Sequence, residues 1–117
     1  MEIGIALYTI ELHGCLNGVY TNDVANGEIS SEIAKLKPDI DTGEHGFSGE
    51  YDCFYFDQSN SREGWTLTIK AHNTHSSQNI YFFDFIWKSK NGKIDFVGKG
   101  NRMNHQQIAV QYKHLKK

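Results

Sequence analysis

The sequence predicts an all-β fold, an eight-stranded antiparallel up-and-down β-barrel that residues 1–117 form as one domain. Three observations favour this fold class. Aromatic residues make up 13% of the chain, and their side chains suit a pleated, half-buried surface. Eleven glycines with a single proline are typical of many short strands and tight turns. Apolar and polar residues also alternate along several short segments that are bounded by turn residues.

The strongest local signal is a β-hairpin over residues 80–100, which read IYFFDFIWKSKNGKIDFVGKG. Two apolar runs are joined by Asn91 and Gly92, and Asn-Gly favours a type I′ turn because both residues tolerate positive φ. Side chains alternate along a strand, so the two faces of each run can be read from the sequence. One face of the first run carries Tyr81, Phe83, Phe85 and Trp87.

The remaining strands are expected in order along the chain. Residues 65–72 give the cleanest alternation and place Trp65, Leu67, Ile69 and Ala71 on one face. Gly49 indicates a β-bulge or a close backbone approach. Loops are expected at 38–46, 58–64 and 73–78, and the chain is expected to turn again at 101–105. Besides the hairpin, the expected strands are 3–12, 15–22, 28–36, 47–57, 65–72 and 106–114.

Residues 28–36 are ambiguous between strand and helix. Ile29, Ile33 and Leu36 fit helical spacing, and so short a segment does not settle the period. We interpret the segment as a strand because the segments around it are strands. Eight strands can close into a barrel that holds side chains or one small ligand, and closure removes edge strands that invite aggregation. An open sandwich of two sheets is the alternative.

Charge and hydropathy exclude several classes of protein. The net charge of −2 and the pI of about 6.3 give no attraction to nucleic acid or to a membrane surface. No apolar run approaches the ~18 residues of a spanning helix. The first residues carry no basic segment of a signal peptide, so a cytoplasmic location is expected. Cys15 and Cys53 are expected to be reduced thiols rather than a disulfide framework.

No catalytic motif stands out, so an enzyme is less favoured than a binding protein, and no cofactor is expected. A zinc site at His72 and His75 would need two further ligands, which His45 or His105 could supply only by an accident of folding, so solvated loop histidines are the preferred interpretation. Asp39, Asp41 and Glu50 resemble part of a calcium loop, but Glu44 stands where such a loop needs glycine. An acidic loop without metal is therefore expected.

Three segments resemble the avidin–streptavidin family, within the calycin group of ligand-binding barrels. CLNGVYTND (15–23) is similar to the opening strand of that family, and FSGEYDC (47–53) is similar to its third strand. FIWKSKNGKIDFVGKG (85–100) is similar to its Trp-Lys hairpin. Residues 3–12 resemble the final strand of the family, which implies a circular permutation in which they pair with residues 106–114.

The resemblance implies a ligand site at the barrel mouth. Asn22 and Tyr51 match an asparagine and a tyrosine that hold the ureido oxygen of biotin in the family. Trp87 and Phe96 match its pocket tryptophan and phenylalanine, and a second pocket tryptophan would fall near Tyr112.

Other polar positions of the family site are not kept. Cys53 stands in place of a threonine, and Ala6 stands in place of an asparagine. Each lost polar partner weakens binding by ~1–3 kcal/mol, so tight biotin binding is not expected.

The expected function is the binding of a small, partly apolar molecule without catalysis. Asp84 either lines the barrel and supplies a polar contact or lies on the surface. The aromatic stripe of the hairpin either lines a pocket or forms an oligomer interface, as in a dimer or tetramer. The alternative function is a structural or protein-interaction module with a filled core. The expected ligand-binding residues are Asn22, Tyr51, Asp84, Trp87, Phe96 and Tyr112.

Overall fold

The computed structural model describes residues 3–11, 14–23, 27–37, 47–56, 61–71 and 82–115. None of these residues is α-helical, and they form eight β-strands. The strands are β1 (Ile3–Ile10), β2 (Cys15–Asn22), β3 (Ser30–Leu36), β4 (Gly49–Phe56), β5 (Ser61–Ala71), β6 (Phe82–Ser89), β7 (Ile94–Arg102) and β8 (Gln107–His114).

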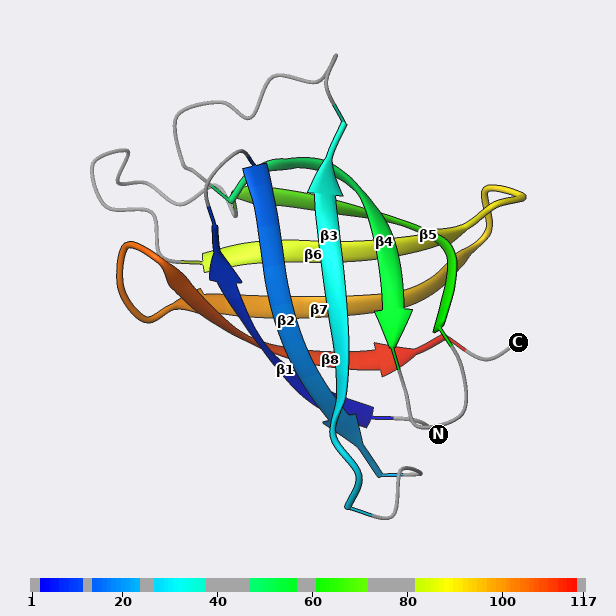
Figure 1. Cartoon of the computed structure of the whole chain (residues 1–117), viewed down its shortest axis with the longest axis horizontal. Helices are drawn as coiled ribbons and strands as arrows, with labels where there is room; N and C mark the ends of the chain where they lie inside the picture. Colours follow the sequence, from blue (N-terminus) through cyan, green and yellow to red (C-terminus); the bar gives the residue numbers. More distant parts are fainter. Residues whose placement is uncertain are drawn as a thin grey trace.

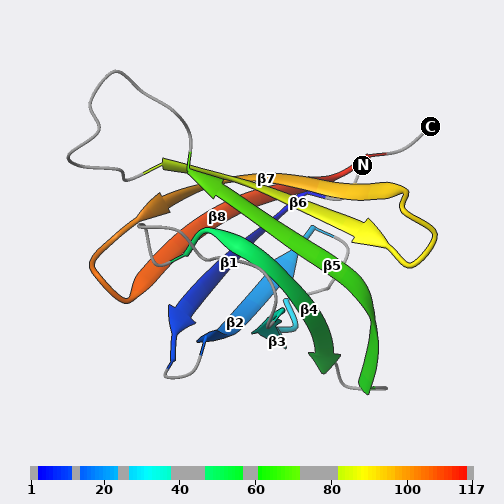
Figure 2. The same cartoon turned by 90° about the horizontal axis from the view of Figure 1, so that it is seen from above.

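The eight strands form one closed barrel in which each strand pairs with its neighbours in sequence. Every pairing is antiparallel. Figure 1 shows β2 and β3 crossing in front of β6, β7 and β8. Figure 2 shows these two groups on opposite sides, with β4 and β5 curving between them. The predicted all-β, up-and-down barrel is confirmed, and the open sandwich is excluded.

The barrel closes where β1 pairs with β8. In this seam Ile5 lies opposite Gln111 and Leu7 lies opposite Ala109. The predicted pairing of residues 3–12 with residues 106–114 is therefore present. The same seam gives β1 and β8 a second neighbour each, so neither strand is left as an edge.

The inward and outward faces alternate as the sequence predicts. Leu67 and Ile69 of β5 are buried inside the barrel, and so are Phe83, Phe85 and Trp87 of the neighbouring strand β6. Tyr81 lies outside the described residues. Residues 30–36 form a strand, which resolves the ambiguity of this segment. Both cysteines are free thiols, as predicted.

Some boundaries differ from the prediction. Residues 61–64 belong to β5 rather than to a loop, because they pair with the end of β4, where Phe56 lies opposite Ser61. The register shift in β4 lies between Cys53 and Phe54, not at Gly49. Pairing with a neighbouring strand outweighs the polar composition of residues 61–64.

The β6–β7 hairpin is confirmed, but its predicted two-residue type I′ turn is wrong. The Gly92 N–H donates to the Ser89 carbonyl over 2.9 Å, and the Ser89 N–H donates to the Lys93 carbonyl over 2.8 Å. Three residues therefore separate the closing pair, and Gly92 takes the left-handed conformation with φ of 85°. Such three-residue loops combine a type I turn with a bulge.

Candidate functional site

One end of the barrel is lined by aromatic side chains, which we call the aromatic rim. At this end β2, β4, β6 and β8 finish and β3, β5 and β7 begin. Some members are only half-buried, among them Tyr20, Tyr55, Trp65 and Phe96. The aromatic rim consists of Tyr20, Tyr55, Trp65, Trp87, Phe96 and Tyr112.

The aromatic rim is continuous through ring-to-ring contacts. Tyr55 meets Trp65 and Tyr20 edge-on, with ring centroids 5.2 and 6.1 Å apart. Tyr112 lies 6.4 Å from Tyr20 and 5.8 Å from Trp87 between ring centroids. Such distances and edge-to-face angles are those at which aromatic pairs attract one another. The rim therefore forms a defined apolar wall at this end of the barrel.

A buried carboxylate lies inside the barrel, next to this wall. Glu32 of β3 is 3% exposed, and its Oε1 accepts a hydrogen bond of 2.6 Å from the Tyr8 hydroxyl. Its other oxygen, Oε2, is buried and has no hydrogen-bond partner. Because most buried polar groups are paired, an unpartnered carboxylate oxygen needs an explanation.

The electrostatics of Glu32 combine two opposing effects. Burial raises the pKa of the Glu32 carboxyl, while the hydrogen-bond donors on Tyr8, Cys53 and Trp87 favour its charged form and lower the pKa. The raising effect is the larger, so Glu32 binds its proton more tightly than an ordinary glutamate. The sequence offered no signal for this residue.

The neighbouring phenols and thiol stay protonated. Burial raises the pKa of the Tyr8 hydroxyl, and the Glu32 charge raises it further. Burial likewise raises the pKa of Cys53 and of Tyr55, again with a contribution from Glu32. A thiol with a raised pKa is a poor nucleophile. The group around Glu32 therefore offers hydrogen-bond donors rather than a reactive thiolate.

The structure brings together most of the residues predicted to bind a ligand. Trp87, Phe96 and Tyr112 contact one another, with ring centroids 5.8 to 6.4 Å apart. The Asn22 side-chain amide donates to the Tyr112 hydroxyl over 3.3 Å. Asn22, Trp87, Phe96 and Tyr112 therefore lie at the same end of the barrel.

Tyr51 and Asp84 lie elsewhere. Tyr51 sits toward the opposite end, where it is 1% exposed and its hydroxyl donates to the Phe47 carbonyl over 2.9 Å. Burial raises the pKa of Tyr51 to about 12. Asp84 points outward and forms an ion pair with Lys99. The interpretation of Asp84 as a surface residue is therefore the correct one of the two alternatives.

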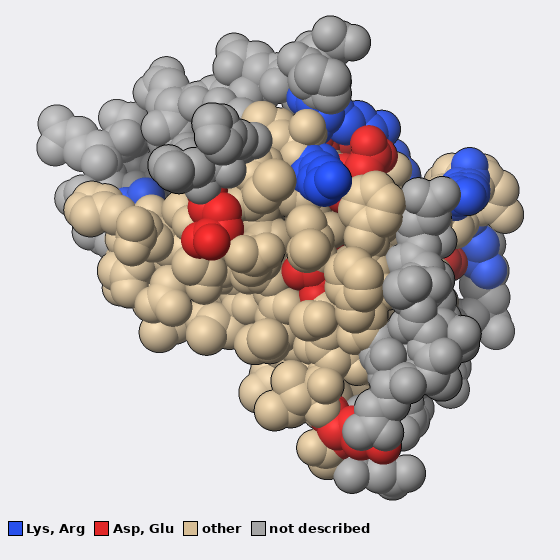
Figure 3. Space-filling view, in the orientation of Figure 1, with Lys and Arg blue, Asp and Glu red and all other residues tan. Residues whose placement is uncertain are grey.

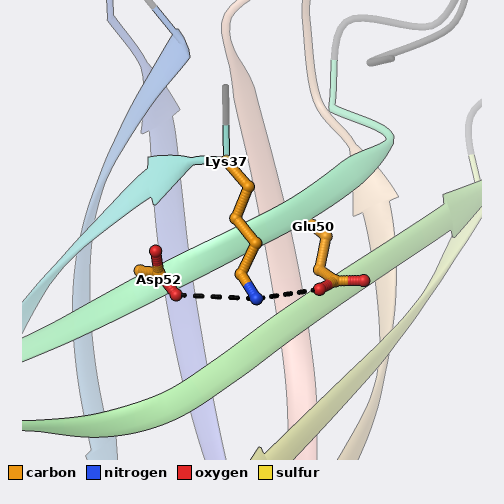
Figure 4. Close-up of polar contacts among 3 residues, drawn as sticks. All are labelled: Lys37, Glu50 and Asp52. Atoms are coloured by element: carbon orange, nitrogen blue, oxygen red, sulfur yellow. Dashed lines mark ion pairs between the residues drawn. The ribbon is translucent and has the colours of Figure 1, made fainter. Parts of the chain in front are cut away.

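Of the four acidic residues named in the segment that resembles a calcium loop, only Glu50 lies within the described residues, and it pairs with a lysine. Figure 4 shows Lys37 between Glu50 and Asp52, at N···O distances of 3.0 and 3.8 Å. Asp39, Asp41 and Glu44 lie outside the described residues, as do His72 and His75. Within the described ranges, no three His, Cys, Asp or Glu side chains gather closely enough to hold a metal ion.

A groove of about 560 Å³ lies on the outside of the barrel, over β1, β2, β7 and β8. Its exposed apolar side chains include Ile5, Val19 and Ile29. Figure 3 shows a wide area without Lys, Arg, Asp or Glu at the lower left of the molecule. The groove is distinct from the interior, because Ile5 and Val19 point away from the side on which Tyr8 and Glu32 lie.

The raised pKa of Glu32 predicts an unusual dependence of stability on pH. The folded state holds the Glu32 proton more tightly than the unfolded state, whose glutamates titrate near ~4.3. The protonated Glu32 carboxyl therefore contributes its full stabilisation of the folded state below that pH. This contribution is lost as the pH rises through the raised pKa. Glu32→Gln has no such titration, so its unfolding free energy relative to wild type should increase with pH. Urea unfolding of both proteins between acidic and weakly basic pH measures this difference.

Asp52→Asn is the matched control for that experiment. Asp52 is an exposed acid on the outer face of β4, next to Cys53. Removing its charge should change stability by less than about 1 kcal/mol, as is usual for an exposed ion pair. If the unfolding free energies of wild type and Glu32→Gln change in the same way with pH, the raised pKa of Glu32 is contradicted.

No protein-family model, curated protein or solved structure matches the chain. No described helix is long and apolar enough to span a membrane. The fold assignment therefore rests on the strand order itself, a closed eight-stranded antiparallel barrel compatible with a calycin-like fold.

Proposed function

We propose that this chain is an avidin-like barrel that binds a small, partly apolar molecule at the aromatic rim, without catalysing a reaction. The carrying observation is the combination of a half-buried aromatic wall with an unpartnered buried carboxylate oxygen behind it. Ligand sites are mostly apolar with a few convergent polar groups. Trp87, Phe96 and Tyr112 supply the apolar wall, and Asn22 and Glu32 supply polar contacts.

The resemblance to the avidin–streptavidin family supports this proposal in part. The residues that match its pocket tryptophan and phenylalanine, Trp87 and Phe96, contact each other at the rim. The β1–β8 pairing that a circular permutation requires is present. The permutation itself and the family relationship stay predictions. The polar anchor we propose here, Glu32, is not one of the residues that the resemblance implied.

The proposal is tested by two measurements. Native mass spectrometry of protein purified from its host should reveal a retained small molecule. Titration with a neutral aromatic probe, 2-phenylethanol, should change the tryptophan fluorescence and saturate. Phe96→Ala removes part of the half-buried wall and should weaken binding of the probe about threefold to tenfold.

The control is Phe82→Ala, which removes the same side chain from the exposed outer face. This variant should bind the probe as wild type does. Absence of both a retained molecule and saturable binding would leave a filled barrel and exclude the proposed function.

A structural or protein-interaction role is the second candidate, and the outer groove favours it. Ile5 and Ile29 are 63% and 71% exposed there, and contiguous exposed apolar residues often mark a protein contact. A homodimer or homotetramer would cover such a face. The subunit count from the same native mass spectra tests self-assembly through this face, and a purely monomeric protein at high concentration would exclude it.

A further inference from the structure

The environment of Glu32 points to the charge of the ligand. Glu32 is 3% exposed, yet no described lysine or arginine forms an ion pair with it. The ion pairs seen among the described side chains join Lys37 to Glu50 and Asp52, and Lys99 to Asp84. A buried carboxylate without a cationic partner is unusual, because a buried charge is normally paired.

The hydrogen bonds around Glu32 satisfy one half of the carboxylate. The Tyr8 hydroxyl donates to Oε1 over 2.6 Å. Oε2 has no hydrogen-bond partner and is buried. A ligand that donates an N–H to Oε2 would complete the carboxylate. Tyr8 meanwhile fixes its orientation, because the Tyr8 ring is itself held by stacking on Phe85.

The aromatic rim gives a second, independent reason to expect a cationic ligand. Tyr55 borders Glu32 across the β3–β4 pairing, and it contacts Trp65 and Tyr20 edge-on. Aromatic faces attract cations, most strongly where water is excluded. A positive group at the half-buried rim would therefore meet attractive aromatic surfaces, whereas the nearby Glu32 carboxylate would repel an anion.

From these contacts we infer that the site takes an organic cation, a protonated amine carried on an aromatic or alkyl body. The ammonium group donates to Glu32 Oε2, and the apolar body lies against Trp87, Phe96 and Tyr112. This inference rests on the proposed function, since it names the ligand class of the same site. It differs from a ureido-type ligand, which is neutral.

A charge series of matched probes tests the inference on the wild-type protein. The probes are 2-phenylethylamine, 2-phenylethanol and 3-phenylpropionate, which share a phenyl group and differ in charge. Isothermal titration calorimetry at neutral pH should show the amine binding about tenfold or more tightly than the alcohol, because a hydrogen bond to a charged group is the stronger kind. The carboxylate should bind most weakly.

Two variants test whether Glu32 causes the preference for the amine over the alcohol. Glu32→Gln keeps the shape of the side chain, and it should reduce the amine-to-alcohol preference to about threefold or less while alcohol binding is retained. Asp52→Asn removes one negative charge from the outer face and should leave the preference unchanged. Thermal unfolding of each variant verifies that it is folded, and the wild-type charge series stands independently of any variant.

The outcomes separate the inference from the proposed function. Equal binding of amine and alcohol, or an unchanged preference in Glu32→Gln, would overturn the cation assignment and leave a neutral-ligand barrel. Binding of none of the three probes up to their solubility would overturn both. An amine preference that disappears in Glu32→Gln and persists in Asp52→Asn would support the assignment.

Discussion

Replacing Phe85 with alanine is expected to lower the free energy of unfolding by about 3–5 kcal/mol. Phe85 is 0% exposed and lies between two rings, with centroids 5.7 Å from both Tyr8 and Trp87. Its removal loses the transfer free energy of the ring and leaves a cavity that the closed barrel cannot readily collapse around. Urea unfolding, monitored by circular dichroism, measures the loss.

Phe82→Ala provides the comparison within the same strand. Phe82 is 52% exposed on the outer face of β6, so its removal should change stability by less than about 1 kcal/mol. A similar loss for the two variants would contradict the inward orientation of Phe85. The result also reports on the interior, because the stack of Tyr8, Phe85 and Trp87 runs past the Glu32 carboxylate.

Replacing Gly18 with valine is expected to destabilise the fold by about 3 kcal/mol or more. A Cβ atom at Gly18 would lie 2.6 Å from Cε1 and 2.7 Å from Cδ1 of Tyr8. Tyr8 has little freedom to yield, because its ring stacks on Phe85 and its hydroxyl donates to Glu32. The variant therefore combines overpacking with loss of the hydrogen bond to Oε1.

Two comparisons test this explanation of the Gly18 effect. Val19→Ile adds one carbon at the next position of β2, where the side chain is 47% exposed, and should stay within about 0.5 kcal/mol of wild type. Gly18→Val in a Tyr8→Ala background should cost clearly less than in wild type, because the ring that it meets is gone. An unchanged cost would show that Tyr8 is not what the new side chain meets.

The parts of the fold that could be predicted depend on period and local turn chemistry. Trp65 and Leu67 alternate with polar residues, so their face was readable from the sequence alone. Asn91 and Gly92 marked the hairpin correctly, but the turn is longer than predicted because the register of β6 and β7 shifts between Trp87 and Lys88. Alternation locates strands, and it does not locate a shift of register.

Residues of the candidate site could be predicted only where the pattern of their own strand shows that they face the interior. Trp87 stands in an apolar run that has to face the core. Glu32 stands in a mixed segment, and glutamate is rarely buried, so sequence reasoning passes over it. The side chains that act on its carboxyl, Tyr8, Cys53 and Trp87, come from three other strands. Only the closed barrel brings these residues together.

The seam between β1 and β8 has a consequence for the order of folding events. Neighbours such as β6 and β7 pair across a three-residue loop, whereas β1 and β8 pair only when the sheet of eight strands closes into a barrel. Loop-closure entropy grows with length, and pairings distant in sequence slow folding. The seam is therefore expected to form after the local hairpins. Until then, β1 and β8 each present an open edge to other chains, so a crowded refolding solution would favour aggregation over closure.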